Sequence, residues 1–152
     1  MKAQIKKASV LLMLAISLFS FSSLPGGEGF EVYLNNKVIM QRFGNQLNNP
    51  QTIQLSEANP NDELRIKYHH CGQPGKNRIL TIKDSQDKIL KEIRFADADK
   101  PVSDMACKVK DIISLKKGNN NVFKLHYRSS ELPNGRLLAT ILAGSQRNAT
   151  QP

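Results

Sequence analysis

The stretch RILTIKDSQDKILKEIRF, residues 78–95, decides the fold class of this chain. Apolar and polar side chains alternate in 78–83 and again in 89–95, which is the period of an extended strand with one buried face. The polar residues 84–87 between them supply a turn. The stretch therefore predicts a β-hairpin. The side chains expected to face the core are Leu80, Ile82, Ile89, Ile93 and Phe95.

The same alternation recurs on both sides of this hairpin, broken at short intervals by Asn, Gly, Pro or Asp. Asn35-Asn36 tolerates the positive φ angles of a tight hairpin turn, and Asn134-Gly135 is a strong signal of the same kind. The segment 96–109 has no sustained alternation and is predicted to be a connector. The other predicted strands are 30–34, 37–43, 52–55, 64–69, 112–115, 122–128 and 136–143.

Eight or nine short strands separated by turns are typical of an all-β immunoglobulin-like or Greek-key sandwich. We expect this single domain to occupy residues 30–143. A flexible lead-in, 24–29, precedes it, and the polar residues 144–152 are predicted to be a disordered tail.

The first 23 residues have the pattern of a secretory signal peptide. An amino-terminal region with three lysines precedes the apolar run 8–21, and small serines follow it. The run is shorter than the roughly 20 apolar residues that span a bilayer. We therefore expect cleavage after Ser22 or Ser23, and a periplasmic or secreted mature protein with no stable membrane anchor.

Two cysteines, Cys71 and Cys107, remain in the mature chain. In an oxidising compartment an even count favours a disulfide, so these two are predicted to be bonded. The alternative is a soft-metal site built from both thiols, Met105 and nearby histidines. The leading interpretation includes no metal and no other cofactor.

The mature chain is moderately basic. Removing three lysines and no acid leaves 19 Lys and Arg against 13 Asp and Glu, a net charge of +6. Such an excess favours acidic partners. Trp is absent and only nine residues are Phe or Tyr, which argues against dense aromatic stacking of single-stranded nucleic acid.

His69-His70-Cys71 is the most chemically suggestive tripeptide. Adjacent residues of a strand point to opposite faces, so the two histidines are poorly placed to ligate one metal. We expect His70 to lie at the rim of the core with a hydrogen bond, and His69 to point outward.

Aspartates at 84, 87, 97, 99 and 104 are candidates for a loop calcium site, although their spacing is not that of an EF-hand. The sequence contains no nucleophile elbow, zinc-protease helix or phosphate-binding glycine loop. A catalytic pair of carboxylates assembled by folding is the remaining route to an enzyme.

Two predicted strands carry basic side chains opposite their apolar ones. If both strands lie in one sheet, these side chains form a single solvent-facing basic surface. The predicted ligand-binding residues are Arg65, Lys67, His69, Lys124, His126 and Arg128.

The leading interpretation is therefore an exported, non-catalytic binding or assembly module that recognises an anionic ligand through a basic sheet face. The expected partner is an acidic polysaccharide, an anionic lipid or another envelope protein. The alternatives are a small exported carbohydrate-active hydrolase and a periplasmic metal-binding protein.

Overall fold

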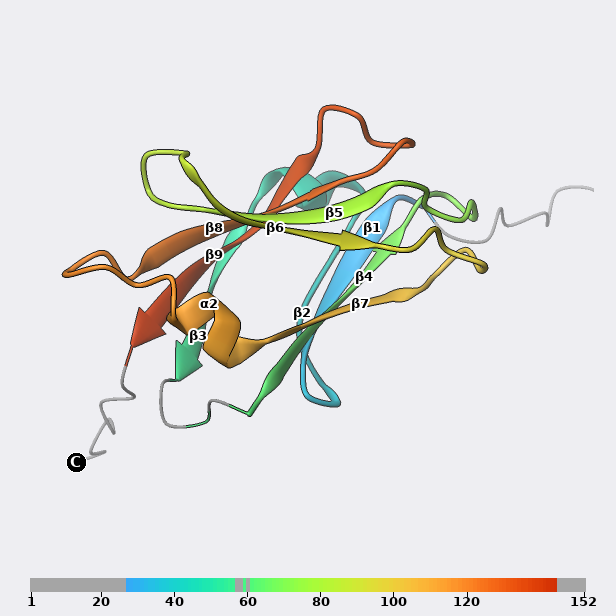
Figure 1. Cartoon of the computed structure of the whole chain (residues 1–152). Helices are drawn as coiled ribbons and strands as arrows, with labels where there is room; N and C mark the ends of the chain where they lie inside the picture. The colour runs from blue at the N-terminus through green and yellow to red at the C-terminus, as the bar shows by residue number, and fades with distance from the viewer. Residues whose placement is uncertain (1–26, 57–58, 60, 145–152) are drawn as a thin grey trace, which may run out of the picture.

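The computed structural model describes residues 27–56, 59 and 61–144. They form two packed β-sheets with the hydrophobic core between them, which confirms the predicted all-β sandwich (Figure 1). The predicted signal segment 1–23, residues 24–26 of the lead-in and residues 145–152 of the tail lie outside the described residues. Within the described residues, no helix has the length and apolar character needed to cross a bilayer.

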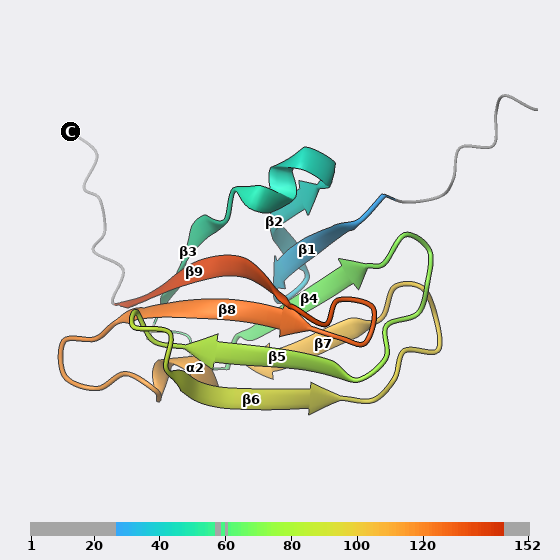
Figure 2. The same ribbon diagram turned by 90° about the horizontal axis from the view of Figure 1, so that it is seen from above.

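The sheets contain four and five strands. In the described part of the chain, the strands are β1 (Gly29–Leu34), β2 (Lys37–Phe43), β3 (Gln51–Ser56), β4 (Glu63–His69), β5 (Arg78–Lys83), β6 (Ile89–Phe95), β7 (Asp104–Lys108), β8 (Val122–Arg128) and β9 (Arg136–Gly144). The four-stranded sheet has the order β2-β1-β4-β7, and the five-stranded sheet has the order β3-β9-β8-β5-β6 (Figure 2). Strand β3 runs parallel to β9, and the other pairs are antiparallel.

The connections between the sheets follow a Greek key. From β4 the chain crosses to the β5–β6 hairpin in the other sheet, returns to β7 beside β4, and crosses again to β8 beside β5. This alternation between sheets is the connectivity of immunoglobulin-like sandwiches. It places β4 and β8 in different sheets.

Alternation builds the core as the sequence predicts. Leu64, Ile66 and Tyr68 of β4 are buried, and so are Phe123 and Leu125 of β8. The residues between them on each strand are partly exposed. Each strand therefore buries one face and presents the other to solvent.

The predicted hairpins form at the predicted turns. Asn35 joins β1 to β2 with φ of 56°, and Gly135 lies before β9 with φ of 68°. A Cβ at Gly135 would lie 3.0 Å from the carbonyl oxygen of Tyr127. In the β5–β6 turn, Asp84 Oδ1 accepts hydrogen bonds from the backbone N–H groups of Gln86 and Lys88. At this turn the Asp84 carboxylate thus accepts hydrogen bonds from backbone N–H groups in place of the carbonyl groups of a neighbouring strand.

Two segments differ from the prediction. The expected connector 96–109 contains β7, where only Met105 and Cys107 alternate inward, too few for the pattern to be recognised. The expected strand 112–115 is instead the end of a short helix, α2 (Val109–Ile113), and the turn that follows it. Val109 and Ile112 are its buried residues, and their three-residue spacing suits a helix better than a strand. A 3-10 helix, η2 (Gly44–Asn48), links β2 to β3.

Ile89 was expected to face the core but is 53% exposed. The register between β5 and β6 shifts at Ile82/Lys83, so Ile82 pairs with Lys91 and Lys83 pairs with Ile89. This irregularity turns Ile89 outward with Lys83, while Leu80 and Ile82 remain in the core.

The predicted disulfide is wrong. Cys71 is exposed in the turn after β4, whereas Cys107 on β7 pairs in register with Leu64, near the start of β4. Seven residues of extended chain separate these positions, about 20 Å, whereas a disulfide joins Cα atoms less than about 7 Å apart. Both thiols are free, and the same separation excludes one metal bound by both.

Candidate anion-binding face

The six predicted ligand-binding residues do not form one surface. Their alternation with core residues is as predicted, but β4 and β8 belong to opposite sheets (Figures 1 and 2). Arg65, Lys67 and His69 therefore face one side of the sandwich. Lys124, His126 and Arg128 face the other. The prediction of a single basic surface is wrong because alternation fixes which face a residue takes but not which sheet its strand joins.

The basic residues of β4 are neutralised by neighbouring acids. Arg65 lies 2.8 Å from a carboxylate oxygen of Glu63 and 3.6 Å from one of Asp104. Lys67 Nζ lies 3.7 Å from Asp104 and 4.8 Å from the ring centroid of Tyr33. These contacts leave the outer face of the four-stranded sheet with little uncompensated positive charge.

His69 packs against the edge of the four-stranded sheet. Its ring meets that of Phe43 edge to face, with the centroids 5.3 Å apart. Phe43 lies over Gly29, where a Cβ would be only 2.0 Å from the ring. His69 is thus part of an aromatic contact on this face, and its Nε2 atom has no hydrogen-bond partner among the described residues.

The basic residues of β8 lie beside further cations that the sequence prediction missed. Lys124 pairs in register with Lys83 of β5, and Arg128 pairs with Ile79, which on its other side pairs with Arg94 of β6. Ile79 lies outside the core cluster yet is only 4% exposed. We attribute its burial to the aliphatic stems of the flanking arginines. If the sequence had indicated that β5 lies between β6 and β8, Lys83 and Arg94 would have been included among the predicted ligand-binding residues.

Positive charge exceeds negative charge on this outer face. Four fixed cations, Lys83, Arg94, Lys124 and Arg128, stand against two carboxylates. One carboxylate, Asp87, lies 2.9 Å from Lys124 Nζ, and this hydrogen bond lowers the pKa of Asp87. The other, Glu92, is 3.6 Å from the largely exposed Arg94. In the described part of the chain, Lys83 and Arg128 have no ion pair.

His126 lies between these cations. Its side chain is half-buried, and its Nε2 atom has no hydrogen-bond partner among the described residues. Burial lowers the pKa of His126, and the neighbouring charges of Lys83 and Lys124 lower it further, while the charge of Asp87 opposes them. We call the set Lys83, Arg94, Lys124, His126 and Arg128 the basic face.

His70 is part of a buried polar cluster at one end of the sandwich. Its Nε2 atom lies 2.9 Å from the hydroxyl of Tyr127 and 3.4 Å from that of Ser129. The side chain is 8% exposed, as expected for a rim histidine with a hydrogen bond. Ser129 is 3% exposed, so this Ser–His contact is closed to a substrate.

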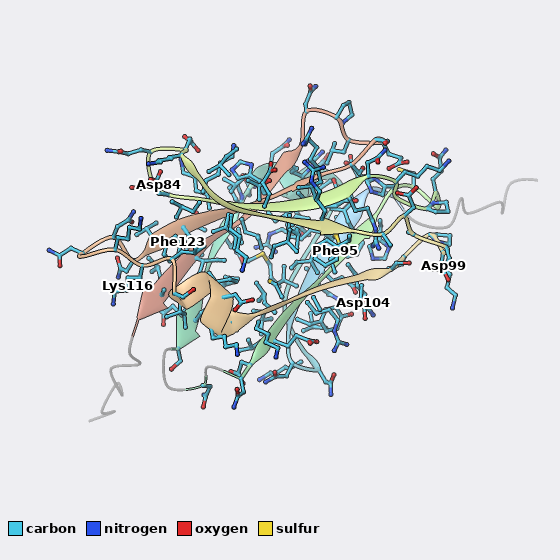
Figure 3. The ribbon with its side chains drawn as sticks, viewed as in Figure 1. Asp84, Phe95, Asp99, Asp104, Lys116 and Phe123 are labelled. Atoms are coloured by element: carbon cyan, nitrogen blue, oxygen red, sulfur yellow. The ribbon has the colours of Figure 1, made fainter. Side chains whose placement is uncertain are left out.

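The candidate acids do not converge. Asp84 and Asp99 lie at opposite ends of the sandwich (Figure 3). Asp97 accepts a hydrogen bond from the backbone N–H of Asn77, and Asp104 is held by Arg65 and Lys67. In the described ranges, no three His, Cys, Asp or Glu residues are grouped as metal ligands.

A shallow depression of about 290 Å³ lies between the edge strands β6 and β7. Two carboxylates line it, but Asp111 is 3.5 Å from Lys91 and Glu63 is 2.8 Å from Arg65. Cys107 also lines the depression, and burial raises the pKa of its thiol to about 12. The depression therefore holds paired charges and a protonated thiol rather than an activated acid, base or nucleophile.

The fold and the charge distribution define the class of this protein: an immunoglobulin-like β-sandwich with one charge-balanced outer face and one basic outer face. Its sequence matches no protein-family model and no curated protein.

Proposed function

We propose that this protein is an exported, non-catalytic binding module that captures an acidic polysaccharide on the basic face. The observation that carries the proposal is the register pairing of Lys83 with Lys124, beside His126 and Arg128. Like charges directly opposite one another destabilise a strand pair. A polyanion across these positions relieves that repulsion and neutralises Arg128 as well.

The spacing of the cations suits an extended polyanion. Alternate residues of a strand lie about 7 Å apart, so Lys124, His126 and Arg128 form a row about 14 Å long. Lys83 and Arg94 widen this row across the neighbouring strands. A linear chain with regularly repeated carboxylate or sulfate groups meets several of these charges at once.

The apolar surface favours a polysaccharide over a membrane. Surface binding to a bilayer usually combines attraction to anionic lipids with apolar side chains that insert below the headgroups. Within the described residues, the exposed large apolar side chains are Val38, Ile39 and Phe43 on β2, in the other sheet, and Ile89. Only Ile89 borders the basic face, beside Lys83.

The decisive experiment compares heparin, polygalacturonate and phosphatidylglycerol vesicles as ligands for two matched double variants. Lys83→Gln with Arg128→Gln removes two basic-face charges that have no ion pair in the described chain. Lys37→Gln with Lys108→Gln removes two exposed lysine charges from the four-stranded sheet, where Lys108 pairs in register with Glu63.

We expect the basic-face variant to bind a polysaccharide about 5- to 30-fold more weakly, since each exposed charge contact contributes up to about 1 kcal/mol. The control variant should bind as the wild type does, and added salt should weaken the wild-type complex. Equal losses in the two variants, or no binding to either polysaccharide, would contradict the proposal. If vesicle binding depends on Lys83 and Arg128 but polysaccharide binding does not, the ligand of the basic face is a lipid surface rather than a polysaccharide.

A further inference from the structure

We infer that His126 links capture of the acidic polysaccharide to uptake of a proton, so that the basic face binds more tightly in acidic surroundings. The inference rests on the proposed function and adds a regulation of the same site. It is carried by the position of the half-buried imidazole in the sheet, among the cations of the basic face.

Few negative charges face the His126 ring. In register, it pairs with Thr81 of β5 and Leu137 of β9, both uncharged. On its own strand, Lys124 and Arg128 lie two residues away on either side, and Lys83 lies diagonally across on β5. All of these charged neighbours are cations.

The two nearby carboxylates are paired with other cations, although the charge of Asp87 also acts on His126 and opposes that of Lys83. Asp87 accepts a hydrogen bond from Lys124 Nζ at 2.9 Å. Glu92 is on β6, one strand further away, where it pairs in register with Thr81 and lies 3.6 Å from Arg94. In the free protein, a proton on His126 would therefore add to a cluster of positive charge without a dedicated counter-ion.

Ligand binding reverses this balance. A bound carboxylate or sulfate group brings negative charge beside the ring, although the Nε2 atom itself is closed to solvent. This negative charge favours the protonated imidazole. By linkage, a ligand that raises proton affinity is itself bound more tightly as the pH falls. The effect is limited to about tenfold in affinity per pH unit for a single proton.

The other described histidines do not share this position. His69 lies on the opposite outer face against Phe43, and His70 is buried against Tyr127. His69→Gln is therefore the matched control for His126→Gln. His126→Lys provides a third variant with a fixed charge at the same place.

The test is isothermal titration calorimetry with a heparin oligosaccharide between pH 7.5 and 5.5, in paired buffers of different ionisation enthalpy. For the wild type and for His69→Gln, we expect net proton uptake near pH 6.5 and an affinity that rises at least several-fold over this range. His126→Gln should lose both effects. His126→Lys should bind at pH 7.5 about as tightly as the wild type binds at pH 5.5.

Two negative results are distinguishable. If heparin and polygalacturonate do not bind at either pH, the proposed function fails and this inference fails with it. If a polysaccharide binds through Lys83 and Arg128 but without proton uptake, or if His126→Gln keeps the uptake, only the role of His126 is overturned. Circular dichroism at both pH values establishes that each variant remains folded.

Discussion

Lys83 of β5 and Lys124 of β8 face each other directly across an antiparallel pair in the middle of the five-stranded sheet. Of these two lysines, only Lys124 has an ion-pair partner in the described chain, which is Asp87 at 2.9 Å. Directly opposed like charges destabilise a sheet, so this arrangement lowers the stability of the free protein.

Lys83→Gln is therefore expected to stabilise the free protein. Removing one of the two opposed charges should raise the free energy of unfolding by about 0.2–1 kcal/mol, the usual range for a cross-strand pair. Urea denaturation at low ionic strength measures the change, and the gain should shrink as salt is added. A variant less stable than the wild type at low salt would show that packing of the aliphatic stem of Lys83 stabilises the fold by more than repulsion from Lys124 destabilises it.

Stability should fall on mild acidification. Burial lowers the pKa of His70 below its ordinary value of 6.5, and burial together with Lys83 lowers that of His126. The unfolded chain therefore takes up these protons first, so the full stability is present above pH 6.5 and is lost as the pH falls through the folded-state values. Urea midpoints from pH 8 to 5 should decrease below about 6.5. The double variant His70→Gln with His126→Gln should show a flatter profile, and an equally steep one would assign the effect to other groups.

Tyr127→Phe should destabilise the end of the sandwich that holds His70. The hydroxyl lies 2.9 Å from His70 Nε2, and both side chains are buried. Loss of a buried partner costs about 1–3 kcal/mol, and the longer 3.4 Å contact from Ser129 favours the lower part of that range. Tyr33→Phe is the control, because its hydroxyl donates to Glu31 on a partly exposed face. Equal effects in thermal unfolding would mean that the His70 contact contributes nothing specific.

The two cysteines should differ in reactivity. Cys71 is exposed in its turn, whereas Cys107 is buried with its pKa raised to about 12. Mass analysis after maleimide treatment should find one adduct in the native protein and two after denaturation, and Cys71→Ser should abolish native labelling. A mass two hydrogens lower than the free-thiol form, together with no labelling of the denatured protein, would instead indicate an intramolecular bond.

Much of the fold follows from local sequence signals. Asn35 and Gly135 adopt the positive φ angles that their turns require, and the hairpin within 78–95 forms with both strands at the expected positions. Helix α2 and strand β7 were missed because each is short. With two or three apolar residues in a segment, the periods of helix and strand are hard to distinguish.

The candidate site was only half predictable. Alternation placed Lys124, His126 and Arg128 on a solvent face, but the neighbours of a strand depend on long-range pairing that no local pattern encodes. That pairing separates Arg65 and Lys67 from the basic face and brings Asp104 beside them. It also brings Lys83 opposite Lys124.

The parallel pairing of β3 with β9 has a consequence for how the chain reaches its native state. Among the described strands, β9 is the only partner of β3 and is also the last to be synthesised. A nascent chain that ends before residue 136 contains all of β3 but lacks β9, the strand with which β3 pairs. Contacts between such distant segments slow folding because a long loop must close before any of them forms. Formation of the complete five-stranded sheet, and with it the native surroundings of β8, is therefore a late event that awaits the carboxyl-terminal strand.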